Sequence, residues 1–264
     1  MSKMSPEILP AVVSIATTDS GCGAGIQADL LTFAARNTFG TTLITNLTAQ
    51  NPDAVLAIEE LSSEFIEAQW KALHGFFDLK AIKTGMLFSE RVIRLVAGFL
   101  REVEIPIVID PVMVSTSGAV LLQEEAIEAL REELLPLATV ITPNLDEAKV
   151  LLGWRPETKA DMGRAAAKLA KLFGTAVLLK GGHLEGEAEL VDVLHWGDGE
   201  QREFRHLRID GVDTHGSGCT LASAVAAELA KGYRLELAVA EALTYLHRTL
   251  AQPLQVDGRR YINH

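Results

Sequence analysis

Short runs of valine, isoleucine and leucine alternate along the chain with longer stretches in which apolar residues recur three and four positions apart. The short runs are typical of strands buried on both faces of a parallel sheet, and the longer stretches are typical of amphipathic helices. We expect strands over 11–17, 41–47, 79–84, 106–110, 138–142 and 175–180. We expect helices over 25–38, 62–77, 89–103, 123–135, 144–153 and 158–173. The alternation predicts a three-layer α/β/α fold, in which helices cover both faces of a mostly parallel central sheet.

The pattern changes after Lys180. Two segments of alternating polarity, AELVDVLHW and REFRHLRI, flank the turn signal Gly197-Asp198-Gly199 and predict an antiparallel pair of strands. Helical patterns over 217–231 and 235–251 then close the chain, with Gly232 between them at a C-cap position. Because no repeat or low-complexity linker divides the sequence, we expect a single domain over residues 1–264.

Composition narrows the possible partners. The chain has 264 residues, is 48% hydrophobic and carries a formal net charge of −11, which argues against a nucleic-acid partner. No apolar run approaches the roughly 20 residues that span a bilayer, and residues 1–10 lack the apolar core of a secretory signal. We therefore expect a cytoplasmic protein without a membrane partner, in which Cys22 and Cys219 are free thiols.

Ligands of open parallel sheets bind beyond the carboxyl ends of the strands. Polar residues and glycines follow nearly every expected strand, at 19–25, 50–51, 85–86, 110–113, 143–147 and 180–183. We expect these positions to meet in one ligand site.

Residues 213–220 form the most informative of the polar segments. Asp213-Thr-His-Gly-Ser-Gly-Cys-Thr220 runs directly into the helical pattern LASAVAAELAKG. Backbone N–H groups at such a helix start attract anions, and Gly216 and Gly218 would let the backbone approach a phosphate closely. The alternative is a glycine turn that only begins a helix.

Several segments together resemble one family. The run THGSGCTLASAVAAELAKG is similar to the C-terminal signature of hydroxymethylpyrimidine/phosphomethylpyrimidine kinases, a branch of the ribokinase superfamily, with Ser217 in place of a frequent Thr. Further similar segments, in chain order, are TDSGCGAGIQADLLTF, LTAQN, KTGML, DPVMVSTSG, TPNLDEA and LLKGGHL. The resemblance spans residues 11 to about 250 and implies a ribokinase-like fold and a homo-oligomer, most simply a dimer.

Cys219 lies where the family carries a cysteine and most of the superfamily carries an aspartate thought to be the catalytic base. A helix N-terminus lowers the pKa of a thiol, so a thiolate base for the substrate hydroxyl is reasonable. The alternative is a small residue that fills space at the helix start. With Cys219, the resemblance implies Gly216, Ser217 and Gly218 as the catalytic turn and Thr214 as a nucleotide contact.

The resemblance implies ATP and Mg²⁺ as cofactors. Asn144 and Glu147 form an N-x-x-E element, for which a metal-linked role competes with a reciprocal capping box. Lys180 would reach the phosphates of ATP, and Asp110 would face both the phosphates and the metal. A solvated strand-end lysine and a turn residue before Pro111 are the respective alternatives.

The substrate of the family is an aminopyrimidine, which needs a planar slot with directional polar groups. Gln50 can both donate to and accept from that edge, and Asp29 could add an acceptor. Met86 would supply an apolar wall, and Gly23 belongs to the first substrate loop. A surface amide, a helix-face carboxylate and a core methionine are the alternatives for Gln50, Asp29 and Met86.

The first loop departs from the family pattern, which reads approximately A-G-S-D-x-S-G-G-A-G, because Thr17, Gly21 and Cys22 stand there, and Asn46 replaces a small apolar residue. We expect ATP-dependent phosphorylation of 4-amino-5-hydroxymethyl-2-methylpyrimidine, and of its monophosphate, in the supply of thiamin precursors. Two alternatives stay open: a pyridoxal or pyridoxine kinase, and a catalytically weak sensor that binds a pyrimidine or a nucleotide.

Overall fold

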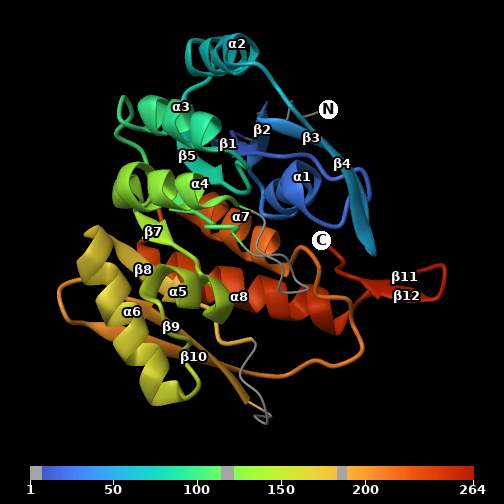
Figure 1. Ribbon diagram of the computed structural model, residues 1–264. Helices are drawn as coiled ribbons and strands as arrows, with labels where there is room; N and C mark the ends of the chain where they lie inside the picture. The colour runs from blue at the N-terminus through green and yellow to red at the C-terminus, as the bar shows by residue number, and fades with distance from the viewer. Residues whose placement is uncertain (1–7, 114–121, 183–188) are drawn as a thin grey trace, which may run out of the picture.

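The computed structural model describes residues 8–113, 122–182 and 189–264 (Figure 1). Its main sheet has eight strands in the order β10-β9-β8-β7-β6-β5-β1-β2. The strands are β1 (Ala11–Ala16), β2 (Phe39–Ile44), β5 (Leu79–Thr84), β6 (Ile107–Ile109), β7 (Val140–Ile141), β8 (Ala176–Leu179), β9 (Glu189–His195) and β10 (Gln201–Leu207). Pairing is parallel from β2 to β8 and antiparallel for β8–β9 and β9–β10. The predicted mostly parallel sheet is confirmed.

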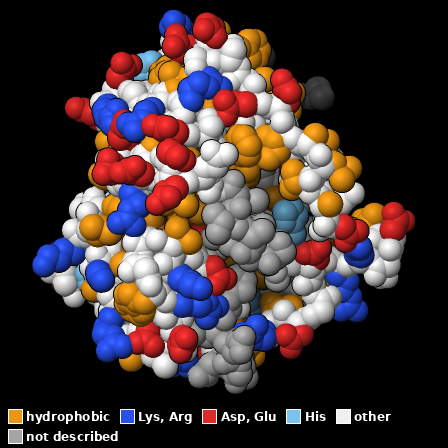
Figure 2. Space-filling model, viewed as in Figure 1, with side chains coloured by type: hydrophobic (Ala, Val, Ile, Leu, Met, Phe, Trp, Pro, Cys, Tyr) orange, Lys and Arg blue, Asp and Glu red, His pale blue; other side chains and the backbone are white. Residues whose placement is uncertain are grey.

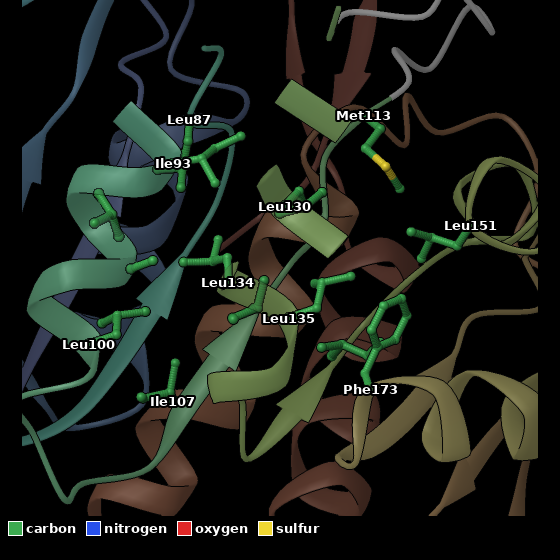
Figure 3. Close-up of a cluster of buried hydrophobic side chains, with 14 of the residues drawn as sticks. Leu87, Ile93, Leu100, Ile107, Met113, Leu130, Leu134, Leu135, Leu151 and Phe173 are labelled. Atoms are coloured by element: carbon green, nitrogen blue, oxygen red, sulfur yellow. The ribbon is translucent and has the colours of Figure 1, made fainter. Parts of the chain in front are cut away.

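Helices cover both faces of this sheet, as the alternation of side chains along its strands requires. In β1, Val13 contributes to the hydrophobic cluster on one face and Val12 to the cluster on the other. The first face is covered by α2 (Ser63–His74), α3 (Glu90–Leu100), α4 (Glu124–Ala129), α5 (Leu145–Leu152) and α6 (Lys159–Phe173). The second face is covered by α1 (Gly25–Ala35), α7 (Ser217–Ala230) and α8 (Leu235–Ala251). Figure 3 shows side chains of the first cluster converging from these separate elements.

The helix expected over 123–135 is interrupted. After α4 the chain forms a π-helical turn over Leu130–Leu134 and a 3₁₀ turn over Leu135–Leu137. Pro136 has no N–H to donate to the preceding turn, so a regular α-helix cannot continue through it. Leu130, Leu134 and Leu135 are nevertheless buried, because the altered winding keeps them facing the sheet (Figure 3).

A two-stranded hairpin outside the main sheet was not predicted. The single strand expected over 41–47 is wrong, because β2 ends at Ile44 and a new strand, β3 (Asn46–Asn51), pairs with β4 (Ala54–Glu60). The Asn51 Oδ1 atom accepts hydrogen bonds from the N–H groups of Asp53 and Ala54, at 2.9 and 3.0 Å, which closes the turn. Leu56 is 75% exposed, and hydrophobic side chains gather on this side of the molecule (Figure 2).

The chain ends in a short antiparallel pair, β11 (Leu254–Val256) and β12 (Arg259–Tyr261). On the face drawn in Figure 2, basic and acidic side chains are intermixed, which differs from the continuous basic surface of a nucleic-acid-binding protein. No helix among the described residues has the length and apolar character required to cross a bilayer.

Candidate active site

A cavity of about 750 Å³ opens beyond the carboxyl ends of the parallel strands. Most of the residues singled out in the sequence border it, namely Gln50, Met86, Asp110, Asn144, Glu147, Lys180, Thr214, Gly216, Ser217, Gly218 and Cys219. Residues from six separate segments therefore meet in one site, as the positions of the strand ends predicted. The similar segments at 110–118 and 178–184 lie partly outside the described residues.

The turn before α7 is held in a conformation that needs glycine. Gly216 has a φ of +84°, and a Cβ atom there would lie 1.8 Å from the carbonyl oxygen of Gly23. The Ser217 N–H donates to the carbonyl oxygen of Thr214 at 3.0 Å, which tightens the turn. Gly23 thus supports the turn through its backbone and is not among the residues that border the cavity, a placement that differs from the expected substrate contact.

Gly218 brings the start of α7 against a charged pair. A Cβ atom at Gly218 would lie 3.2 Å from Lys180 Nζ and 3.3 Å from Asp110 Oδ2. Lys180 Nζ itself lies 2.9 Å from Asp110 Oδ1, which also accepts a hydrogen bond from Thr142 Oγ1 at 3.1 Å. Burial opposes the charge of Lys180, but Asp110 and Glu147 raise its pKa, so the ammonium group is retained. A cation and helix N–H groups therefore face the same volume, which suits a phosphate.

Asn144 and Glu147 form the capping box that was the alternative to a metal-linked role. Asn144 Oδ1 accepts hydrogen bonds from the N–H groups of Asp146 and Glu147, at 2.9 and 2.8 Å. In return, Glu147 Oε2 accepts from the Asn144 N–H at 2.7 Å. Burial raises the pKa of Glu147 to about 8, with Lys180 opposing this shift and Asp110 adding to it. The box accounts for one carboxylate oxygen of Glu147 and leaves the other for a ligand.

The raised pKa of Glu147 predicts a pH dependence of stability. In the unfolded chain the group titrates near its ordinary value of 4.5, whereas in the folded protein its pKa is about 8. The folded state therefore binds the proton more tightly, and this contribution to stability is lost as the pH rises from about 4.5 through about 8. We expect Glu147→Gln to flatten that part of the profile, measured as the free energy of unfolding of the ligand-free protein in urea. The exposed Glu125→Gln is the control, and equal slopes in both variants would contradict the assignment.

The Cys219 thiol lies at the first turn of α7, borders the cavity and accepts a hydrogen bond from the N–H of Gly25. Burial raises the pKa of this thiol to about 11; Lys83 opposes the shift, whereas Asp29 and Asp110 add to it. The expected lowering of the pKa by the helix N-terminus is thus wrong for the ligand-free site, because burial and two carboxylates outweigh the helix and Lys83.

Another part of the cavity wall is formed by the first loop, β3 and the segment after β5. Gln50 Nε2 lies 3.3 Å from His215 Nε2, which lies 3.5 Å from Asp19 Oδ2. Although burial opposes it, hydrogen bonds from His215 and from the backbone of the loop keep the pKa of Asp19 below its ordinary value. Met86 borders the cavity, and its carbonyl oxygen accepts from the Thr17 N–H at 3.2 Å. Sequence reasoning missed His215, although its place inside the glycine-containing turn before α7 was a signal.

Asp29 lies behind the cavity and does not border it. Both of its carboxylate oxygens lie 2.8 Å from Lys83 Nζ, and both side chains are fully buried. Ser14 also donates to this carboxylate, and Ser223 Oγ donates to Asp29 Oδ1 at 2.7 Å. The placement differs from the expected pyrimidine contact, because the acceptors of Asp29 are occupied by these three neighbours.

The departures in the first loop have local structural consequences. Cys22 is exposed and adopts a φ of +60°, a conformation that costs a residue with a Cβ atom roughly 1–2 kcal/mol. Thr17 Oγ1 donates to the carbonyl oxygen of Asn46 at 3.1 Å, so two of the departing residues contact each other. Thr17 borders the cavity, whereas Cys22 and Asn46 do not.

The start of α7 and Lys180 face one cavity at the edge of a mostly parallel sheet. This combination is typical of a small-molecule kinase with a ribokinase-like fold. Comparison with known proteins agrees. Residues 19–263 match the family model of phosphomethylpyrimidine kinase. The hydroxymethylpyrimidine/phosphomethylpyrimidine kinase of Rhizobium meliloti is 45% identical over 256 residues, which cover 96% of this chain and 96% of the relative. The chain belongs to the phosphomethylpyrimidine kinase family.

Solved structures give the same fold. The phosphomethylpyrimidine kinase of Clostridium difficile superposes with a TM-score of 0.81 at 38% identity, over 90% of this chain and 98% of that one. A pyridoxal kinase of Bacillus subtilis, solved as an ADP complex, superposes with a TM-score of 0.90 at 36% identity, over 97% of this chain and 98% of that one. The fold is therefore shared by kinases whose names give different vitamin precursors as acceptors.

Proposed function

We propose that this protein transfers the γ-phosphoryl group of ATP to the hydroxymethyl group of 4-amino-5-hydroxymethyl-2-methylpyrimidine, and then a second phosphoryl group to the monophosphate, in the supply of thiamin precursors. The observation that carries the proposal is the meeting of Cys219, the start of α7 and Lys180 at one cavity, in a chain of this family. The acceptor hydroxyl would lie beside Cys219, and the transferred phosphoryl group would lie against the turn.

In the proposed reaction the hydroxymethyl oxygen forms a bond to the γ-phosphorus while the bond to the ADP oxygen breaks. Cys219 takes the hydroxyl proton as the base. The N–H groups of Gly218 and Cys219 have no partner within the helix at its first turn, so they can donate to the phosphoryl oxygens. The dipole of α7 and the ammonium group of Lys180 add positive potential where negative charge is greatest.

Asp110 and Glu147 fit a magnesium ion. Magnesium in kinases is held by one or two carboxylates together with the phosphates of the nucleotide. Each of these two carboxylates lies within electrostatic reach of Lys180 at the phosphate end of the cavity. Burial is the main cause of the raised pKa of Glu147, and the charge of Asp110, which a cation would offset, adds to it. When bound, the ion would neutralise the phosphates and orient them. Asn144 and Thr214 would contact the nucleotide beside it, and both border the cavity.

The cavity extends on either side of the phosphate position. On one side Leu207, Ile209 and Leu246 border it and provide an apolar surface suited to a nucleoside. On the other side Gln50 and Met86 border it. The amide of Gln50 can accept from the exocyclic amine of an aminopyrimidine and donate to the neighbouring ring nitrogen. This complementarity favours the pyrimidine over pyridoxal as acceptor.

The second candidate is a pyridoxal kinase, which the structural similarity to the Bacillus subtilis enzyme favours. A mass-spectrometric assay of the purified protein with ATP and Mg²⁺ separates the two. The acceptors are hydroxymethylpyrimidine, its monophosphate and pyridoxal, each at the same concentration. We expect preferential phosphorylation of the two pyrimidines. A preference for pyridoxal would overturn the proposed acceptor, and binding without product would favour the sensor.

The remaining expectations rest on the sequence. A single kinase domain over residues 1–264 is consistent with the family match to residues 19–263. A cytoplasmic location is supported by the two free thiols at Cys22 and Cys219. The homo-oligomer, most simply a dimer, stays a prediction that sedimentation of the purified protein would test.

A further inference from the structure

A cluster of buried polar side chains lies beneath the start of α7, on the sheet face that α1 and α7 cover. Ser14 on β1 and Lys83 on β5 are register partners in the parallel sheet, so their side chains point to the same face. Val12 and Ala81, two positions earlier on each strand, belong to the apolar cluster on that face. Asp29 of α1 closes the polar cluster from above with its two bonds to Lys83. An ion pair is thus inserted into an otherwise apolar layer.

The cluster is tied directly to the helix that carries Cys219. Ser223 donates to Asp29 Oδ1 at 2.7 Å, and Ser223 lies four residues after Cys219 in α7. Residues four apart lie on the same face of a helix, one turn from each other. The Asp29–Lys83 pair therefore lies one helical turn beneath the Cys219 thiol.

The pair has a defined orientation relative to the cavity. Lys83 is among the residues that border the cavity floor, whereas Asp29 is not. A Cβ atom at Gly85, where β5 leaves the sheet, would lie 2.9 Å from Lys83 Nζ, so the ammonium group lies at the end of the strand that faces the site. The positive end of the pair therefore lies on the side of the cavity, which Cys219 also borders, and the negative end lies behind it.

Stability alone gives little reason for such a pair. Burying two charges costs solvation free energy, and replacing a buried ion pair by well-packed apolar residues is often neutral or stabilising. We propose that the Asp29–Lys83 pair is an electrostatic device for Cys219, in which Lys83 favours the thiolate and Asp29 both holds Lys83 in place and limits its effect.

The charges around Cys219 agree with this orientation. The groups that act on the thiol are Lys83 of β5, Asp29 of α1, Asp110 after β6, Lys180 after β8 and the N–H of Gly25. After burial, Lys83 has the largest influence on the pKa of Cys219 and lowers it, whereas Asp29 raises it less strongly. Although burial opposes the charge of Lys83 itself, Asp29, Cys219 and Asp110 raise its pKa, so the ammonium form persists. Any effect of the pair on kcat rests on the proposed role of Cys219 as the base. Its effect on the ionisation of the thiol is independent of that role.

Alkylation of Cys219 tests the proposal without any substrate. The chain has two cysteines, and Cys22→Gly removes the other thiol at a position whose φ of +60° suits glycine. In that background the rate of iodoacetamide addition to Cys219 is followed by intact-mass spectrometry between pH 7 and 9, since only the thiolate reacts. We expect Lys83→Met to slow the reaction at a given pH by about tenfold, which corresponds to one unit of pKa. We expect Asp29→Asn, which removes the negative charge and keeps the shape, to accelerate it.

The opposite signs distinguish an electrostatic role from a structural one. If the pair only supports packing, both single variants loosen the site and change the rate in the same direction, and this result would overturn the proposal. Thermal unfolding of each variant shows whether it is folded. Should Lys83→Met not fold, the neutral double variant Asp29→Asn with Lys83→Met replaces it. A double variant slower than the parent supports the proposal, whereas an equal or faster one overturns it.

A parallel measurement separates this proposal from the proposed reaction. If Cys219 is the base, kcat for pyrimidine phosphorylation falls in Lys83→Met by a factor similar to that of alkylation, while the KM for ATP changes little. The alkylation rates of the two single variants could change in opposite directions while kcat stays unchanged. That result would support the electrostatic effect of the pair on the thiol and would exclude Cys219 as the base.

Discussion

Replacing Cys219 with alanine is expected to reduce kcat for phosphoryl transfer by about 100-fold or more, because a positioned general base contributes typically 10²–10⁴-fold. The thiol is small and partly exposed to the cavity, so the free energy of unfolding should change little. The reaction is measured with purified protein, ATP, Mg²⁺ and the hydroxymethylpyrimidine. Cys22→Gly is the matched control, since it removes the other free thiol, and its kcat should stay close to that of the parent.

The dependence of kcat on pH gives a second test of Cys219 as the base. Because the pKa of Cys219 is raised to about 11, the thiolate fraction grows throughout the range from pH 7 to 9, and kcat should rise with it. Cys219→Asp introduces the residue that the wider superfamily carries at this position, and its carboxylate should already be ionised in that range. We expect this variant to recover part of the activity and to lose the rise with pH. Full activity in a folded Cys219→Ala variant would exclude the thiol as the base.

Replacing Gly216 with alanine is expected to be the most disruptive single change to the site. The added methyl group would lie 1.8 Å from the carbonyl oxygen of Gly23, and the residue would keep a φ of +84° that L side chains rarely adopt. Backbone on both sides of the contact must shift, so we expect a loss of about 2 kcal/mol or more in the free energy of unfolding. Phosphoryl transfer should fall with it, because the turn can no longer present its N–H groups to the phosphate.

Urea denaturation and steady-state kinetics of Gly216→Ala check this expectation. Gly98→Ala is the control, since Gly98 lies inside α3 and the added methyl group would meet no described atom beyond its own helix within 4 Å. Alanine there should stabilise the helix by roughly 0.5–1 kcal/mol. Parental stability and activity in Gly216→Ala would mean that the turn and the first loop can separate without cost.

The sheet and its helices could be predicted because local patterns decide them. Apolar runs such as PIVID are strand-like in almost any context, and the helix over 235–251 has the bounds that its periodicity indicated. The β3–β4 hairpin could not, because β4 is exposed along most of its length and so shows no alternation between buried and exposed positions. Its turn signal, Asn51-Pro-Asp53, was present in the sequence without a strand pattern beside it.

The sequence predicted the site residues that follow strands. It did not predict the properties that depend on burial among other elements. Asp110 and Lys180 follow strands and meet at the cavity. Lys83 looked like an ordinary polar residue near the end of a strand, and its importance depends on Asp29, 54 residues away in the sequence. The pKa of Cys219 could not be inferred from the helix start alone, because burial and carboxylates from other elements determine its direction.

In the proposed reaction, the hairpin that sequence analysis missed separates the residue proposed for acceptor recognition from those proposed for phosphoryl transfer. Gln50 lies on β3, whereas Cys219 and Lys180 are carried by α7 and by the segment after β8. The hairpin forms a sheet of its own, so substitutions in it need not disturb the strands that carry the phosphate-binding residues. An ancestral kinase could therefore exchange one vitamin precursor for another by remodelling this appendage while its transfer machinery stayed intact, a modular arrangement that lets acceptor choice evolve faster than catalysis.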